Sequence, residues 1–306
     1  MSLERFLVSS RVARALGLHR GVVALETTVM THGLPPPHGL EVALAMERAV
    51  VEAGADPATV GVVDGRVIVG LEIDEMNRLV ATPDVAKLNL SNLAATLAAG
   101  GSGSTTVATT MLAANQFGIG VFATGGIGGV HRGAAKTDDV SSDLTALARF
   151  PVAVVCSGAK AILDLPRTLE RLETLGVPVY GYGCDELPAF WRRSSGLRLD
   201  QRFDDVPALA AAIREHHALR TGTGVVVANP VPEADELDAK TAARALEAAL
   251  APSRAKAPRG RAVTPTLLAR MEKLTRGKST RANIALLESN ARLAGRLAVA
   301  LAAVED

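Results

Sequence analysis

Aromatic residues are scarce in this chain. Phe, Tyr and Trp together make up 3% of its 306 residues, although apolar residues make up 48%. The core must therefore be built mainly from Ala, Val, Leu and Ile, a mixture that suits Ala-rich helices packed on a Val-rich sheet. A chain of this length can bury a substantial core, either as one large α/β domain or as two smaller ones.

Cysteine is scarce as well. Cys156 and Cys184 are the only two cysteines, and neither belongs to a CxxC pair or to a Cys/His zinc spacing. Two cysteines cannot build the disulfide framework of a small secreted domain. We therefore interpret both as small, buried hydrophobic residues.

The chain lacks an excess of charge and lacks long apolar runs. Lys and Arg total 33 and Asp and Glu total 32, so no basic excess could neutralise a nucleic-acid backbone. No 18-residue uncharged apolar run is present, and the N-terminus has no uninterrupted secretory apolar region. We expect no nucleic-acid partner, no membrane association and a cytoplasmic location, with an amphipathic helix over residues 1–20.

Short Val-rich segments alternate with helical patterns along most of the chain. The predicted strands cover residues 22–29, 119–123, 152–156, 177–182 and 225–228. Asp64-Gly65 separates two further Val-rich runs within residues 59–71 and supplies the positive φ angles of a hairpin turn. These patterns predict an α/β fold with a largely parallel, mixed central sheet covered by helices on both faces.

Residues 252–264 are rich in Pro and Arg and have no apolar periodicity. We predict a linker there, followed by two helices that close the chain. No internal repeat is present, so the prediction is a single domain over residues 1–306.

Polar residues follow several predicted strands at the point where each strand ends. They are Glu26, residues 124–132, residues 157–160 and Asn229. Because ligands bind at the carboxyl ends of parallel strands, these four segments are expected to converge on one site. A polar residue at one strand end is, taken alone, more typical of a turn or a cap.

Lys160 follows the apolar run 152–156 after three small residues, so its side chain is expected to start near the sheet interior. Desolvation lowers the pKa of a lysine and makes a neutral, nucleophilic amine accessible near pH 7. The alternative is a lysine whose stem lies on apolar surface while its ammonium reaches solvent.

Two other segments predict binding of ions or phosphate. The Gly/Ser loop at residues 100–110 opens into a helix, and such a loop lets backbone N–H groups approach a phosphate; a flexible loop with a Ser/Thr N-cap is the alternative. Asp139 and Asp143 are four residues apart, so a helix there would place both carboxylates on one face, where Mg²⁺ or Mn²⁺ could bind. An acidic helix start is the commoner explanation.

Asn283 and Asn290 share one face of the last predicted helix. Solvent exposure is the simple interpretation of that face, although Asn is a poor helix former.

Taken together, these segments resemble the pseudouridine-5'-phosphate glycosidase family over residues 21–294. The most specific strings are ALETTVMTHGLP at 24–35, STTVATTM at 104–111, GIGGVHRGA at 126–134, VVCSGAKAILDL at 154–165, LPAF at 187–190 and GKSTRANIALLESNARLA at 277–294. Two segments, PPPHG at 35–39 and TDDVSSD at 137–143, depart from the usual pattern of the family.

The resemblance implies a role for each matching residue. Lys160 takes the place of the Schiff-base lysine, Glu26 that of the proton donor, and Asp139 that of the carboxylate that holds Mn²⁺. The implied substrate contacts are Lys87, Val107, His131, Ser141, Ser142, Asp143 and Asn283. The family also implies an α/β/α sandwich and a homotrimer.

The implied reaction is the reversible cleavage of pseudouridine 5'-phosphate to uracil and ribose 5-phosphate. An aldolase-like Schiff-base lyase that acts on another phosphorylated sugar would need the same lysine and the same phosphate loop. A protein that binds a phosphosugar without turnover is the third possibility.

Overall fold

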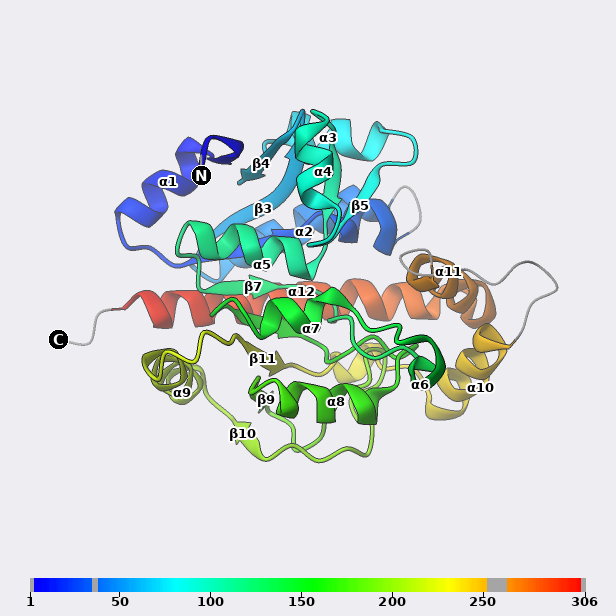
Figure 1. Cartoon of the computed structure of the whole chain (residues 1–306). Coiled ribbons are helices and arrows are strands. Elements are labelled where there is room, and N and C mark those ends of the chain that lie inside the picture. The colour runs from blue at the N-terminus through cyan, green and yellow to red at the C-terminus, as the bar shows by residue number, and fades with distance from the viewer. Residues whose placement is uncertain (1–2, 35–37, 252–262, 304–306) are drawn as a thin grey trace.

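Eleven strands form one sheet between two layers of helices in the computed structural model, which describes residues 3–34, 38–251 and 263–303 (Figure 1). The strand order is β1-β4-β3-β2-β7-β8-β11-β9-β10, and β6 pairs with both β3 and β5. The strands are β1 Phe6–Val8, β2 Val22–Glu26, β3 Asp56–Val63, β4 Arg66–Val69, β5 Ala86–Leu88, β6 Gly103–Thr105, β7 Val121–Ala123, β8 Ala153–Cys156, β9 Val179–Tyr182, β10 Gln201–Phe203 and β11 Val225–Ala228.

The helices connect successive strands and cover both faces of the sheet. They are α1 Ser10–Gly17, α2 His38–Glu52, α3 Ile73–Ala81, α4 Leu93–Ala98, α5 Val107–Gln116, α6 Ala134–Thr137, α7 Ser142–Leu147, α8 Leu165–Thr174, α9 Val206–Ala218, α10 Ala239–Leu250, α11 Val263–Thr275 and α12 Lys278–Ala302. A π-helical turn, η2 Val29–Gly33, follows β2 directly, and short 3-10 turns lie at Leu3–Arg5 and Glu233–Asp235.

The sheet is parallel except around β3, which pairs antiparallel with β4 and β6. The β3–β4 hairpin turns at Asp64 and Gly65, whose φ angles are +48° and +73°. The positive φ expected at both corners of this turn is therefore present. The largely parallel, mixed sheet predicted from the sequence is confirmed.

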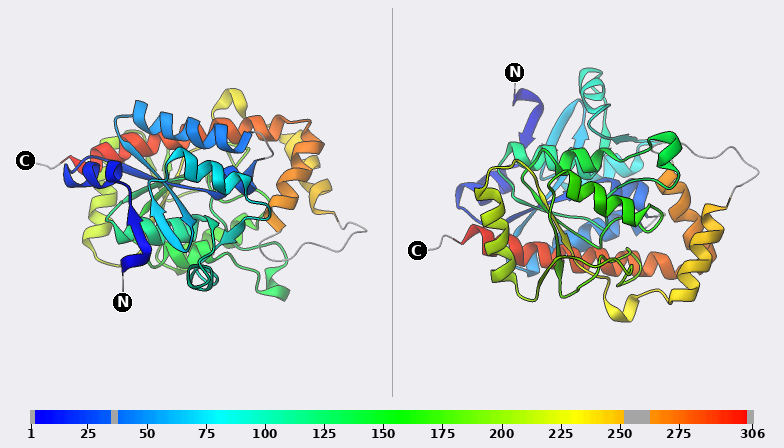
Figure 2. Two further views of the ribbon diagram at one scale, coloured as in Figure 1. Left: turned by 90° about the horizontal axis from the view of Figure 1, so that it is seen from above. Right: turned by 60° about the horizontal axis from the view of Figure 1, so that its bottom comes forward.

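Small residues allow the longest helix to lie close to the sheet and to its neighbour. Helix α12 packs beside α2 on one face, while α5 and α7 cover the opposite face (Figure 2). A Cβ atom on Gly295 would lie 2.6 Å from the Ala53 Cβ, and one on Gly21 would lie 2.6 Å from the Ala298 backbone. This close approach fixes α12 across the sheet, and α12 carries Asn283 and Asn290.

The N-terminal segment differs from the helix predicted over residues 1–20. Phe6–Val8 is a strand that pairs in parallel with β4, and α1 covers only Ser10–Gly17, with Ser9 as its N-cap. The strand forms because it covers the edge of the β3–β4 hairpin, which a helix would leave unpaired.

The closing helices agree with the sequence analysis in number and position. Helix α11 begins at Val263 and α12 at Lys278. Residues 252–262 of the predicted linker lie outside the described residues. No helix in the described ranges is long and apolar enough to cross a membrane.

Candidate active site

A cavity of about 230 Å³ opens at the carboxyl ends of β2, β7 and β8, which are adjacent in the sheet. Glu26 is the last residue of β2, Thr124 follows β7 directly, and Lys160 lies four residues beyond β8. All three line the cavity. The predicted convergence of strand ends is therefore present for these three segments.

Asn229, at the end of β11, does not line this cavity. Its amide nitrogen donates hydrogen bonds to Ser289 Oγ at 3.1 Å and to Asn290 Oδ1 at 2.8 Å. Its predicted place in the site is therefore wrong, and it supports α12 instead.

Glu26 is a buried carboxyl group, 7% exposed, held by two hydroxyl groups. Thr124 Oγ1 donates to Glu26 Oε1 at 2.5 Å, and the Thr28 hydroxyl donates to Oε2. Burial raises the pKa of Glu26; the charge of Lys160 and the two hydroxyl groups oppose this shift without cancelling it. A carboxyl group with a raised pKa can hold a proton for delivery at a pH where an exposed one would have lost it.

The amine of Lys160 ends in the same cavity. The side chain is half-buried, and Nζ donates a hydrogen bond to the carbonyl oxygen of Gly126 at 2.5 Å. The backbone of the lysine loop is tied to the segment after β7, because Lys160 N donates to Ile127 O and Ile127 N donates to Gly158 O, both at 3.1 Å. The two loops hold the amine over the strand ends.

Asp139 and Asp143 do not share a helix face, so this prediction is wrong. Val140 forms a β-bridge with Val130, which keeps the backbone extended, and α7 begins only at Ser142. Asp139 lies before the helix, half-buried at the cavity wall.

Asp143 is 5% exposed and joins two loops of the site. Its Oδ1 accepts from Ala108 N at 3.1 Å and its Oδ2 from Gly128 N at 2.8 Å. A Cβ atom on Gly128 would lie 2.7 Å from Oδ2, so only glycine fits there without a shift. The carboxylate therefore fixes the start of α5 against the segment after β7.

Two lining residues of the cavity are suited to a phosphate. Val107 is the first residue of α5, and helix N-termini bind anions through unpaired N–H groups and the helix dipole. Lys87, on β5, lines the same cavity. The Gly/Ser loop is not merely flexible, because residues 103–105 form β6, a strand that the sequence analysis missed.

The remaining predicted residues also line the cavity. These are His131, Ser141, Ser142 and Asn283. Burial lowers the pKa of His131, and the charges of Lys160 and Lys87 act in the same direction, whereas Asp139 opposes them. A neutral His131 can accept a proton or a hydrogen bond from a ligand.

The α12 face that carries Asn283 and Asn290 is not exposed to solvent. Asn290 is fully buried, and its amide nitrogen donates to Thr124 O at 2.8 Å and to Ser157 Oγ at 3.2 Å. This asparagine therefore joins the segments that carry Thr124 and Lys160, whereas Asn283 reaches the cavity itself.

The cavity contains residues that the sequence analysis did not single out. Thr28, His32, Asn89 and Phe190 are the main ones. Thr28 and His32 lie in the string ALETTVMTHGLP and Phe190 in the string LPAF, so only the resemblance carried a signal for them. Burial lowers the pKa of His32, and Lys87 adds to this effect.

A divalent ion would have few protein ligands here. No group of three or more His, Cys, Asp or Glu side chains is gathered in the described ranges. One carboxylate, Asp139, at the wall of the cavity fits Mg²⁺ or Mn²⁺ with several waters retained, and does not fit a closed zinc site.

Comparison with known proteins identifies the family. Residues 11–300 match the family model described as indigoidine synthase A like protein. The pseudouridine-5'-phosphate glycosidase of Methylobacterium nodulans is 54% identical over 290 residues, covering 95% of this chain and 86% of that protein. The enzyme of the same name from Paracoccus denitrificans is 51% identical over 297 residues, covering 96% and 98%. The chain belongs to the pseudouridine-5'-phosphate glycosidase family.

Solved structures agree with this family and its fold. The prealnumycin C-glycosynthase AlnA, in complex with ribulose 5-phosphate, superimposes with a TM-score of 0.89 at 39% identity, covering 97% of both chains. An indigoidine synthase A-like protein of Thermotoga maritima has a TM-score of 0.88 at 33% identity, covering 98% of both chains. The α/β/α sandwich implied by the resemblance is therefore confirmed.

Proposed function

We propose that this member of the glycosidase family cleaves pseudouridine 5'-phosphate reversibly to uracil and ribose 5-phosphate, through a Schiff base on Lys160. The observation that carries the proposal is that the Lys160 amine and the buried acid Glu26 meet in one cavity beside the Val107 helix start. The names of the relatives support the reaction, and the pentose phosphate bound to AlnA supports the class of ligand.

The reaction needs covalent catalysis because uracil leaves through carbon. The Lys160 amine attacks C1' of the ribose, and the C1'–O4' bond breaks as Glu26 delivers its proton to O4'. The nitrogen, now an ammonium, gives up a proton, and its lone pair forms a C=N bond as the C1'–C5 bond breaks; the electron pair of that bond goes to C5, which takes up one proton in place of the one that the nitrogen lost, and uracil leaves. Water hydrolyses the imine to ribose 5-phosphate and the free amine, so one water is consumed in total. Several moderate steps replace one difficult step.

The purified protein is expected to release uracil from pseudouridine 5'-phosphate and to act poorly on pseudouridine. The phosphate contributes binding energy at Lys87 and Val107, and remote binding energy is used to orient the reacting carbon. We expect kcat/KM to be lower by at least about a hundredfold without the phosphate, because a hydrogen bond to a charged group contributes about 1.5–3 kcal/mol and several are lost.

Chromatographic detection of uracil measures both rates. Binding without turnover would favour a phosphosugar-binding protein, and turnover of another sugar phosphate alone would favour an aldolase-like lyase.

A divalent ion, which we propose is Mn²⁺, would be held by Asp139 and mostly by water, and would neutralise charge on a substrate oxygen. Asp139→Asn is expected to behave like the chelated wild type. Its affinity for Mn²⁺ should fall by more than about tenfold, because the loss of an outer-shell partner alone costs about that much. Asp138→Asn is the matched control, since Asn tolerates the left-handed φ of +52° at that exposed position. Manganese titration of the initial rate separates the variants, and full activity after exhaustive chelation would contradict the metal requirement.

The homotrimer and the cytoplasmic location stay predictions.

A further inference from the structure

Asn89 uses the oxygen of its side chain inside its own loop and leaves the nitrogen unpaired. Its Oδ1 accepts from Ser91 N at 3.0 Å and from Ser91 Oγ at 2.7 Å. A backbone N–H can only donate, so the atom that faces Ser91 is the oxygen of the amide. Nδ2 has no hydrogen-bond partner within the described ranges, yet it is not among the buried polar atoms that lack one. Two N–H donors of Asn89 are therefore accessible to a ligand.

The alternation of side chains along β5 places Lys87 and Asn89 on one side of the chain. Leu88, between them, is fully buried, whereas Lys87 and Asn89 are half-buried and line the cavity. Strand β5 pairs in parallel with β6, which leads directly into α5. Thr109 Oγ1, in the first turn of α5, donates to Leu88 O at 3.3 Å. Asn89 therefore lies beside the N-terminus of α5.

The N-terminus of α5 has few N–H groups left for a phosphate. Thr106 N donates to Thr109 Oγ1 at 2.9 Å, and Ala108 N donates to Asp143 Oδ1 at 3.1 Å. Val107 N has no partner in the described part of the chain. A phosphate group has three strong acceptor oxygens, so a phosphate bound here needs donors beyond this helix end.

The donors around this point match a ligand that only accepts hydrogen bonds. The Lys87 amine, Val107 N and the Asn89 amide nitrogen all donate, and none of them accepts. A ribose hydroxyl group also needs an acceptor for its own proton, and the Asn89 oxygen is already used by Ser91. The amide of Asn89 therefore suits the 5'-phosphate better than a ribose hydroxyl group.

We propose that Asn89 is a substrate-binding residue that donates hydrogen bonds to the 5'-phosphate, beside Lys87 and Val107. The contacts with Ser91 hold the amide in this orientation before the ligand arrives, which lowers the entropy cost of binding. This inference rests on the proposed function, because it adds a residue to the phosphate-binding part of the same cavity.

Two substitutions of Asn89 separate contact with phosphate from support of the loop. In Asn89→Asp, one oxygen still accepts from Ser91, but a carboxylate oxygen replaces the N–H groups that meet the phosphate. Like charges in contact cost more than one lost hydrogen bond, so the dissociation constant for ribose 5-phosphate should rise about a hundredfold. Asn89→Ala only loses a hydrogen bond to a charged group, and the constant should rise about tenfold. The shift of the melting temperature with ribose 5-phosphate concentration measures both constants.

Binding of the base is expected to be unaffected in both variants. In the synthetic direction, at saturating ribose 5-phosphate, the KM for uracil should stay within about twofold of wild type, because the loss is confined to binding of the sugar phosphate. Initial rates at varied uracil concentration measure this constant.

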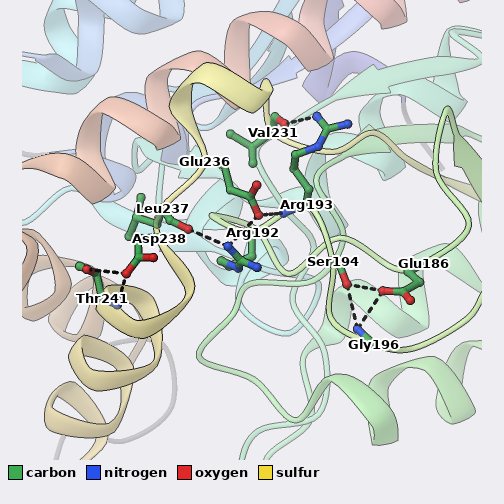
Figure 3. Close-up of polar contacts among 10 residues, drawn as sticks. All are labelled: Glu186, Arg192, Arg193, Ser194, Gly196, Val231, Glu236, Leu237, Asp238 and Thr241. Carbon is green, nitrogen blue, oxygen red and sulfur yellow. Dashed lines mark hydrogen bonds and ion pairs between the residues drawn. The ribbon is translucent and has the colours of Figure 1, made fainter.

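Two controls match the two changes. Ser194→Ala removes the same kind of turn: Ser194 Oγ accepts from Gly196 N at 3.2 Å, two residues on, in a loop that does not line the cavity (Figure 3). Asn115→Asp adds the same charge at an exposed position of α5 that does not line the cavity. Both controls are expected to bind ribose 5-phosphate as the wild type does.

A residue that only supported its loop would give the opposite order, with Asn89→Asp close to wild type and Asn89→Ala the weaker binder. That order would overturn the proposal, and so would unchanged dissociation constants in both variants. Failure of the wild type to release uracil from pseudouridine 5'-phosphate would instead refute the proposed function. The melting-temperature titration needs no turnover, so it reports on Asn89 in either case.

Discussion

Sodium borohydride added with ribose 5-phosphate is expected to attach a pentose phosphate to Lys160. The aldehyde of the open-chain sugar condenses with the amine, water leaves, and hydride from borohydride reduces the C=N bond to a stable secondary amine. Lys160 is the lysine expected to react, because its Nζ lies in the cavity at 2.5 Å from Gly126 O. Peptide mass mapping identifies the modified residue.

Removal of this amine is expected to give the largest loss of activity in the chain. Lys160→Met keeps an unbranched side chain of similar length but has no nucleophile, and kcat should fall by more than about ten thousandfold, the order expected when a covalent nucleophile is removed. Lys136→Met, at an exposed lysine on α6, is the control and is expected to keep full activity. A fully active Lys160→Met, or a sugar trapped on another lysine, would refute the mechanism.

The strands that carry the site could be predicted from the sequence because their signal is local. Strand β11 has the predicted bounds, and β2 and β8 agree within a few residues, since each is a short, buried run rich in valine. The hairpin at Asp64-Gly65 was predictable for the same reason, since the turn chemistry lies in two adjacent residues.

The features that could not be predicted depend on contacts between distant segments. Strand β6 has the composition of a flexible loop, Gly-Ser-Thr, and forms because β3 and β5 flank it. Asp143 carries no sequence signal for its two backbone partners, which lie 35 and 15 residues away along the chain. Tertiary pairing decides such elements, and local propensity does not.

The candidate site divides in the same way. Glu26 and Lys160 follow strong strands, so strand prediction alone brings them to one edge of the sheet. Asn229 also follows a strong strand, yet its side chain turns to α12 and leaves the cavity. Which residues of a strand end reach the ligand is therefore decided by the packing of helices over the sheet.

Glu26→Gln is expected to lower kcat by at least about a hundredfold, the lower end for a positioned general acid, while ribose 5-phosphate still binds. The amide keeps the shape of the carboxyl group and can still meet the hydroxyl groups of Thr28 and Thr124, but it cannot deliver a proton to O4'. Glu47→Gln is the matched control, because burial raises the pKa of Glu47 as well, yet this residue bonds to Thr59 away from the cavity. It is expected to keep wild-type kcat.

The stability of the same Glu26→Gln preparation distinguishes an acid from a structural carboxylate. The pKa of Glu26 is raised in the folded protein, so the stability that its protonated form contributes is present below the ordinary pKa of a glutamate and is lost as the pH rises through the raised value. Gln cannot ionise and avoids this loss, so the melting temperature above that pH should equal or exceed that of the wild type. A carboxylate that only held the Thr28 and Thr124 hydroxyl groups in place would give the opposite pair of results, a lower melting temperature with near-normal turnover in the folded fraction.

In the wild type, kcat should fall as the pH rises through the raised pKa, and the variant should lack this decline, which a pH–rate profile of both proteins measures. A folded, fully active Glu26→Gln would remove Glu26 from the mechanism and leave ring opening without an acid.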